Sequence, residues 1–111
     1  MQAHKNPFEK KIIHVIVPNS LRKYTDGRSE IECNASDLKG LIGEINQHYP
    51  GFQDRLCDTN GEIKSYFNVY IDGEDSRYLN GMRSPLERDS EVVIVAAVAG
   101  GQSEPMNTSV I

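Results

Sequence analysis

Cysteine is scarce in this chain of 111 residues, and tryptophan is absent. The two cysteines, Cys33 and Cys57, lie far apart in the sequence, so they form neither a disulfide framework nor a CxxC motif. No histidine stands near either of them in the sequence to complete a zinc-binding set. We therefore expect both to be ordinary thiols that are buried or half-buried in the fold.

Long apolar runs are also missing. No segment approaches the roughly 20 consecutive apolar residues that a membrane-spanning helix needs. The first residues lack the apolar core of a secretory signal. We therefore expect a cytoplasmic protein that has no membrane partner.

Positive charge is sparse and dispersed. The chain has 12 lysines and arginines against 16 aspartates and glutamates, which gives a net charge of −4. A nucleic-acid backbone demands a clustered positive surface, so this distribution argues against a nucleic-acid partner. It is compatible with a protein partner that presents a basic face.

What the sequence does contain is typical of one globular domain. Hydrophobic residues make up 38% of the chain and charged residues 25%, and the length is enough for one modest core. We expect a flexible N-terminal arm over residues 1–10, a folded domain over 11–101 and a tail over 102–111. The tail has no helical or strand period and contains Pro105, so we do not expect it to pack on the domain.

Several segments have the composition or the alternation of β-strands, and turn-forming dipeptides separate them. The expected strands are 11–17, 28–33, 66–71 and 91–95, with a short edge strand at 76–79. The turn signals are Asp26-Gly27, Asp72-Gly73 and Asn80-Gly81, and a brief helical turn is expected at Ser84-Pro85-Leu86. The last strand is apolar on both faces, which favours a central position in the sheet.

One segment has a clear helical period. Leu38, Leu41, Ile42 and Ile45 form a single apolar stripe. Ser36 is the predicted N-cap, with Asp37 in the first turn, and Pro50-Gly51 ends the helix near Tyr49. A further helical turn is expected around residues 53–56.

The order of these elements predicts an α+β fold. A helix between the second and third strands provides the crossover that brings the last strand beside the first, parallel to it. The expected architecture is a β-grasp (ubiquitin-like) domain. It has a mixed sheet of four to five strands, with one main helix packed on one face.

The end of the chain is unusual because two adjacent glycines, Gly100 and Gly101, follow the last strand directly, and ten further residues follow them. A Gly-Gly pair by itself usually marks a turn or a linker. Here it stands at the end of a whole predicted β-grasp domain, which makes it a far more specific signal.

Two segments resemble the ubiquitin-like sulfur carrier proteins of the ThiS and MoaD type, and are most similar to CysO-like carriers that donate sulfur for cysteine synthesis. They are FNVYIDGEDSRYLNG (67–81) and SPLERDSEVVIVAAVAGG (84–101). The segment HYPGFQDRL (48–56) also fits the exit of the family's helix, so the resemblance spans roughly residues 11–101. The β-grasp fold is what this resemblance implies.

The resemblance also implies a function. An E1-like enzyme would use ATP to adenylate the carboxylate of Gly101, and sulfur would then be held there as a thiocarboxylate. Val98, Ala99 and Gly100 would thread through a channel in the partner, because small residues pass a constriction that larger ones do not. The carrier itself would have no catalytic residue, no bound cofactor and no metal.

One feature departs from the family pattern. Most such carriers end at the second glycine, whereas this chain continues from Gln102 to Ile111. Chains with such a tail are similar to precursors that a JAMM-type zinc protease cuts, which implies cleavage between Gly101 and Gln102. The acceptor of the sulfur would be a synthase, such as a cysteine synthase-like enzyme, that makes cysteine or another sulfur-containing metabolite.

Other interpretations of the sequence remain open. Gly101 could instead be conjugated to other proteins, as in a ubiquitin-like modifier, or the chain could be a MoaD-like small subunit of molybdopterin synthase. A plain β-grasp interaction module with an inert tail is the third alternative. Asp89 and Glu91 are a possible carboxylate pair and His14 a possible catalytic base, but surface and structural roles are more typical of such positions.

Overall fold

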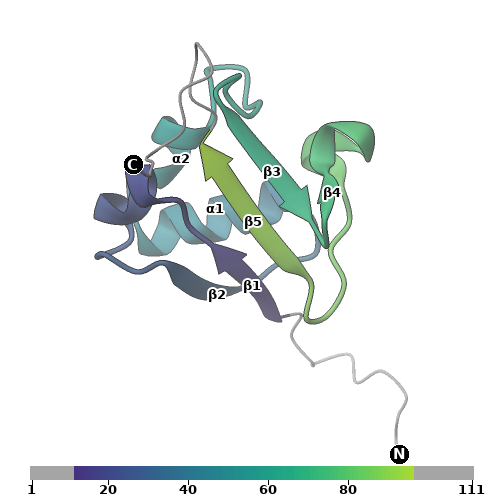
Figure 1. Cartoon of the computed structure of the whole chain (residues 1–111), viewed down its shortest axis with the longest axis horizontal. Helices are drawn as coiled ribbons and strands as arrows, with labels where there is room; N and C mark the ends of the chain where they lie inside the picture. Colours follow the sequence, from purple (N-terminus) through teal and green to yellow (C-terminus); the bar gives the residue numbers. More distant parts are fainter. Residues whose placement is uncertain (1–11, 97–111) are drawn as a thin grey trace, which may run out of the picture.

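A five-stranded mixed sheet forms the centre of the structure, a computed structural model that describes residues 12–96 (Figure 1). The strand order is β2-β1-β5-β3-β4. The strands are β1 (Ile12–Ile16), β2 (Glu30–Asn34), β3 (Phe67–Ile71), β4 (Glu74–Asp75) and β5 (Glu91–Ala96). The helices are α1 (Leu38–His48) and α2 (Phe52–Leu56), and the 3-10 helices are η1 (Asn19–Tyr24), η2 (Ser76–Tyr78) and η3 (Gly81–Arg83).

Residues 1–11 and 97–111 lie outside the described part of the chain. The predicted N-terminal arm over 1–10 and the predicted tail over 102–111 fall in these two ranges, so both stay predictions. The described range covers all but the ends of the domain predicted over 11–101.

The first and last strands lie side by side in the middle of the sheet. β1 pairs with β5 in parallel and with β2 in antiparallel orientation, while β3 pairs antiparallel with both β5 and β4. A parallel pair needs a long crossover connection, and the segment containing α1 provides it. The predicted mixed β-grasp sheet is therefore confirmed, and it has five strands.

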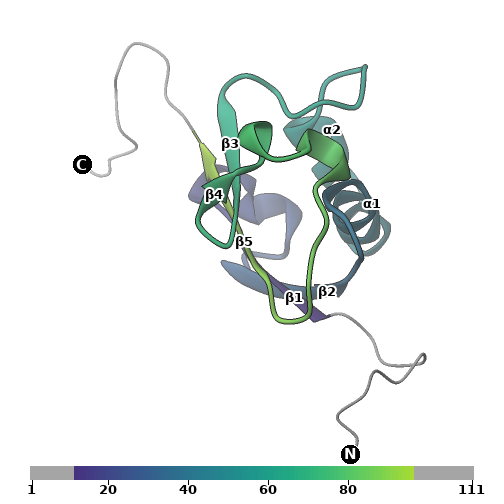
Figure 2. The same ribbon diagram turned by 90° about the vertical axis from the view of Figure 1, so that its right-hand side faces the viewer.

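The core lies between one face of the sheet and the helices. Figure 2 shows α1 and α2 on the same side of the sheet. The apolar stripe of α1, Leu38, Leu41, Ile42 and Ile45, is buried, as predicted. It packs in one cluster with the inward side chains of the strands, which include Ile13, Val15, Val69, Val92 and Ile94.

The N-cap of α1 is Asp37 rather than the predicted Ser36. Asp37 has an extended backbone, and its Oδ1 accepts a hydrogen bond from the amide of Gly40 at 2.7 Å. A carboxylate at this position both caps the free amides and faces the positive end of the helix dipole. The helix ends at His48 and Tyr49 is its C-cap, which agrees with the predicted end near Tyr49.

The segment after β3 differs from the prediction. The expected edge strand over 76–79 is wrong, since the strand β4 is Glu74–Asp75 and the chain then turns into η2. The carboxylate of Asp75 accepts hydrogen bonds from the amide of Arg77 at 2.9 Å and from its guanidinium at 2.6 Å. These local bonds bend the backbone and end the pairing with β3 after two residues.

The predicted helical turn at Ser84-Pro85-Leu86 is also wrong. The helical turn is instead η3, which ends at Arg83, immediately before this segment. Pro85 forms an isolated antiparallel β-bridge with Asp37. The amide of Leu38 donates to the carbonyl of Ser84 at 3.0 Å, and the amide of Leu86 donates to the carbonyl of Ser36 at 2.9 Å. This segment is therefore extended and ties the start of α1 to the connection that leads into β5.

The connection between β1 and β2 is longer than a tight hairpin because η1 is inserted into it. Asp26 and Gly27, the predicted turn, both have positive φ angles of 56° and 80°. The second strand starts at Glu30, two residues later than predicted. Within residues 12–96 no helix is both long enough and apolar enough to cross a membrane.

We predict that Leu41→Ala lowers the free energy of unfolding by about 2–5 kcal/mol, because Leu41 is buried between α1 and the sheet. The matched control is Lys39→Ala, an exposed position on the same helix, which should change it by less than about 0.5 kcal/mol. Urea denaturation followed by circular dichroism measures both. Equal stability of Leu41→Ala and the native chain would contradict the assignment of the stripe to the core.

Candidate functional site: the end of β5 and the open face of the sheet

The chain leaves the sheet at Ala96, the last residue of β5. Because β5 lies between β1 and β3, this exit is in the middle of the sheet rather than at its edge (Figure 1). The predicted site residues Val98, Ala99, Gly100, Gly101 and Gln102 all follow this point and lie outside the described residues. The sequence places Gly101 five residues beyond the exit.

A small cavity of about 210 Å³ adjoins the exit. Its lining residues come from η1, α2, the start of β3 and the end of β5; they are Ser20, Leu21, Arg55, Tyr66, Phe67 and Ala96. The guanidinium of Arg55 lies 5.6 Å from the centre of the Tyr24 ring, a cation–π arrangement that holds this charge near the exit. Tyr66 is half exposed, at 50%.

The face of the sheet opposite the helices carries an apolar patch that lies next to the exit. The strand register aligns Ile16 on β1 with Val93 on β5, and Val93 with Tyr70 on β3. One step nearer to the exit, Val95 is 38% exposed and stands opposite Asn68. We call Ile16, Tyr70, Val93 and Val95 the sheet patch.

The other end of the same face is acidic. The two ring nitrogens of His14 lie 3.3 Å from a carboxylate oxygen of Glu32 and 3.7 Å from one of Asp89, and Glu91 pairs with His14 across the strands. Glu32, Asp89 and Glu91 are exposed, as the surface interpretation of Asp89 and Glu91 predicted. His14 shares its face with the half-buried Ile12 and Ile16, as predicted.

Both cysteines are buried thiols, in agreement with the prediction. Cys33 is 6% exposed and Cys57 is 5% exposed. Burial, with a smaller contribution from nearby carboxylates, raises the pKa of each thiol to about 11. Since the thiolate is the nucleophilic form, neither side chain is prepared for covalent chemistry at neutral pH.

No cluster of three or more histidine, cysteine, aspartate or glutamate side chains between residues 12 and 96 is arranged to hold a metal ion. The described residues present an apolar patch and a small cavity near the point where the chain leaves the sheet, and an acidic region at the far end of the open face.

The sequence of the ThiS family matches residues 15–101 of this chain, a range that starts in β1 and ends at the second glycine. The chain belongs to the ThiS family. The match covers the domain from the second half of β1 onward, together with Gly100 and Gly101, and it leaves out the ten residues that follow them.

Relatives of this ThiS-family chain agree with the assignment. It is 30% identical over 91 residues to a Mycobacterium tuberculosis protein described as sulfur carrier protein CysO, covering 80% of this chain and 98% of that relative. A crystal structure of the Amycolatopsis orientalis BexX/CysO complex contains a similar chain, with a TM-score of 0.75, 27% identity, and coverage of 80% and 99%. The solution structure of the small archaeal modifier protein 1 from Methanosarcina acetivorans has a TM-score of 0.71 at 20% identity and covers 84% of this chain and 99% of that one, which shows the shared fold alone.

The residues of the sheet patch could not be named from the sequence. Their signal was the alternation along β1, where Ile12, His14 and Ile16 all lie on the open face. A strand whose open face carries isoleucine is a sign of a partly covered or partner-facing surface. In the central strand the same signal is hidden, because apolar residues occupy both faces of β5.

We predict that both cysteines of the native protein react slowly with iodoacetamide at pH 9. A thiol with a pKa of about 11 is roughly 1% ionised at that pH, whereas an unfolded thiol is about half ionised or more. Alkylation followed by mass spectrometry should therefore be at least about fifty-fold slower in the native protein than in denaturant. The rate should rise steeply as pH approaches 11, and rapid labelling of the native protein at pH 7 would contradict the prediction.

Proposed function

We propose that this protein is a sulfur carrier that holds sulfur as a thiocarboxylate on Gly101 once residues 102–111 have been removed. The observation that carries the proposal is the position of Gly100 and Gly101 directly after the central strand of a β-grasp sheet, in a chain of the ThiS family. The relatives described as sulfur carriers support the same assignment.

The proposed chemistry needs a free carboxylate at Gly101. One of its oxygens attacks the α-phosphate of ATP and pyrophosphate leaves, which gives an acyl-adenylate. The sulfur of a hydrosulfide ion then attacks the acyl carbon, the bond from carbon to the phosphate-bound oxygen breaks, and AMP departs with that oxygen, which leaves a thiocarboxylate once the sulfur has lost its proton. An E1-like partner supplies the catalytic groups for both steps, and the carrier supplies only the reacting terminus.

The exit from the middle of the sheet suits this role. Residues 97–101 in extended form span at most about 17 Å at roughly 3.4 Å per residue, so a rigid domain can present Gly101 to a partner's active site well away from its own surface. The two glycines lack a Cβ, which allows them to pass a narrow channel. Val98 and Ala99, which precede the glycines in this segment, also have small side chains.

The sheet patch is the proposed docking surface for the E1-like enzyme. It is apolar, partly exposed and adjacent to the exit, so a partner seated on it would lie where the terminus emerges. Arg55 and Tyr66, which line the cavity beside the exit, are available for polar and stacking contacts with the same partner next to the exit.

Two further partners follow from the proposed function. A JAMM-type zinc protease would cut between Gly101 and Gln102, because the carbon of Gly101 is held in a peptide bond in the full-length chain and offers no carboxylate to ATP. A cysteine synthase-like enzyme would accept the sulfur in the formation of cysteine or another sulfur-containing metabolite. We place these steps in the cytoplasm, where ATP and reduced sulfur are available.

Intact-protein mass spectrometry tests the proposal. The full-length chain is incubated with extract of its native cells, ATP and sulfide, with and without a zinc chelator. We expect loss of residues 102–111 and then exchange of one oxygen for sulfur, and we expect the chelator to leave the chain uncut. A chain that ends at residue 101 should be converted despite the chelator, whereas the same chain with Gly101→Ala should stay folded and unconverted.

Three results would oppose this proposal. Adenylation of the full-length chain with its tail intact would remove the need for processing. A cut at any other bond would leave the wrong terminus. A ladder of larger conjugates without any thiocarboxylate would instead assign the chain as a protein modifier.

We predict that Val95→Asp weakens activation by the E1-like partner without unfolding the protein, because it places a charge in the sheet patch next to the exit. The matched control is Gln47→Glu, which adds the same charge at an exposed position of α1, on the opposite face. ATP–pyrophosphate exchange is measured on chains that end at residue 101. The apparent KM for the carrier should rise about tenfold or more for Val95→Asp, as for loss of a central apolar contact, and remain near the value of the unsubstituted chain for the control. Equal KM values for the two variants would contradict docking on this face.

A further inference from the structure

The strand β2 leaves one edge of the sheet open along its whole length. It is the terminal strand in the order β2-β1-β5-β3-β4, and its only strand partner in the described chain is β1. The amide of Val17 donates to the carbonyl of Ser29 at 2.8 Å. Because hydrogen-bonded pairs alternate in an antiparallel ladder, Ile31 and Cys33 also direct their backbone groups toward β1. The backbone N–H and C=O groups of Glu30 and Glu32 therefore point outward, to the open edge.

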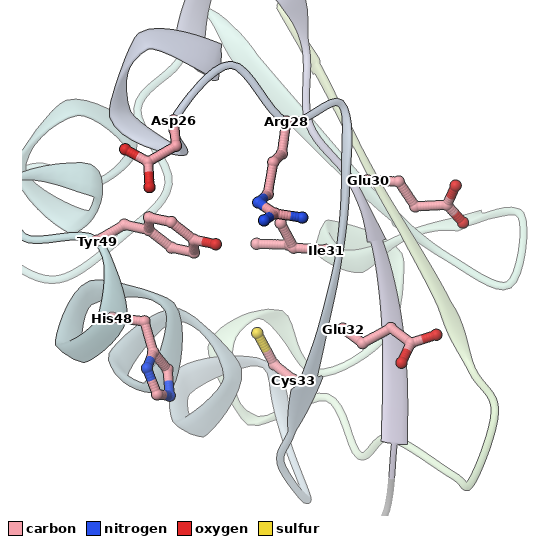
Figure 3. A pocket seen from close by; sticks show the side chains of 8 residues that line it. All are labelled: Asp26, Arg28, Glu30, Ile31, Glu32, Cys33, His48 and Tyr49. Carbon is pink, nitrogen blue, oxygen red and sulfur yellow. The ribbon is translucent and has the colours of Figure 1, made fainter.

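A groove of about 780 Å³ runs beside this edge, between β2 and the C-terminal end of α1. Figure 3 shows the side chains of Ile31 and Cys33 directed into it from β2, with Tyr49 facing them from the end of α1. The other lining residues are Asp26, Arg28, Glu30, Glu32 and His48. The groove is separated from the exit of β5 by β1, so it is a different surface from the sheet patch.

The geometry of the edge matches the addition of one more strand. Side chains of a strand alternate between the two faces of a sheet. A peptide paired with the outward backbone groups of Glu30 and Glu32 would place every second side chain in the groove against Ile31, Cys33 and Tyr49. Its remaining side chains would lie on the open face beside the carboxylates of Glu30 and Glu32, which project from that face in Figure 3.

The charges around the edge decide which peptide fits. Asp26, Glu30 and Glu32 line the groove, with Arg28 as the single basic side chain among its charged lining residues. The carboxylate of Glu32 also contacts His14 at 3.3 Å but remains 63% exposed. Opposite charges across a strand pair stabilise it and like charges oppose it, so a strand with lysine or arginine facing these glutamates is favoured.

The same charges exclude a second copy of this chain as the occupant. Antiparallel pairing of β2 with β2 of another copy would bring glutamates face to face along the new strand pair. Charged residues on an exposed edge strand are a known means of preventing such self-association. The edge of β2 therefore repels another copy of itself. Its outward backbone groups and the apolar residues of the groove can still bind a strand that carries positive charge.

We propose that the edge of β2 and the groove beside it bind an extended segment of a partner protein, by strand addition, in which apolar residues alternate with lysine or arginine. The apolar residues enter the groove and the basic ones face Glu30 and Glu32. This site does not depend on the tail or on the proposed sulfur chemistry, and β1 separates it from β5, so the carrier could hold such a partner while its terminus is engaged elsewhere.

A synthetic seven-residue peptide of alternating lysine and valine, blocked at both ends, is the probe. It is added to the full-length, isotope-labelled protein, and amide shifts and hydrogen exchange are followed by NMR. We expect the largest shifts at residues 30–34 and 48–49, and slower exchange of the amides of Glu30 and Glu32, which the new strand would cover. A peptide in which glutamate replaces lysine should bind at least about tenfold more weakly, since each exposed charge pair then changes sign.

Two double variants with the same net charge test whether the peptide binds at β2 or is only attracted by the overall charge of the protein. Glu30→Lys combined with Glu32→Lys should weaken binding of the lysine peptide roughly tenfold and improve binding of the glutamate peptide. Glu62→Lys combined with Glu87→Lys reverses two exposed charges elsewhere on the protein and should change binding less than about threefold.

Four outcomes would overturn the proposal. They are equal weakening by the two double variants, shifts centred on Val93 and Val95, unchanged exchange of the Glu30 and Glu32 amides, and a dimer of the free protein in which β2 forms the contact. Peptide binding with unprotected edge amides would mean charge attraction without a new strand. Analytical ultracentrifugation of the native chain reports the dimer directly.

Discussion

The parallel pairing of β1 with β5 is the constraint on which the rest of the structure depends. It brings the two ends of the domain together in the centre of the sheet, where Val15 aligns with Val92 and both are fully buried. Parallel neighbours cannot be joined by a tight turn, so the intervening chain has to cross one face of the sheet, and α1 lies on that crossover. The same pairing directs the end of β5 away from the start of β1. The chain therefore leaves the sheet at Ala96, at the end of a central strand.

The two faces of the sheet carry different sets of side chains, because successive residues of a strand point to opposite faces. On one face, Ile13, Val15, Val92 and Ile94 pack against α1 and close the core. On the other, the side chains between them form the sheet patch and, farther from the exit, the acidic surroundings of His14. A change on the open face can therefore alter what the protein binds with little effect on its stability. The proposed docking of an activating enzyme uses this separation.

The features that the sequence predicted well are those in which periodicity and packing agree. The stripe Leu38, Leu41, Ile42 and Ile45 and the strand at 66–71 follow from apolar patterns with one buried face. The central position of 91–95 follows from a segment that is apolar on both faces. The errors lie where local hydrogen bonds decide the outcome. Ser36 was predicted as the N-cap of α1, but Asp37 holds that position through its bond to the amide of Gly40. Asp75 ended a strand through its bonds to Arg77. Of the candidate site, the sequence indicated the terminal glycines, but the sheet patch and the groove beside β2 depend on strand neighbours that only the register reveals.

The burial of Cys33 and Cys57 has a consequence for the intermediates of the proposed reaction. An acyl-adenylate at Gly101 is a strong electrophile, and a thiolate on the carrier's own surface could capture it as an internal thioester. Such a ring would close the terminus onto the domain and stop sulfur delivery after activation had already consumed ATP. A buried thiol with a pKa of about 11 is almost entirely protonated at neutral pH and is therefore a poor nucleophile. The interior thus keeps the protein's own sulfur from competing for the acyl group with the sulfur that it is to carry.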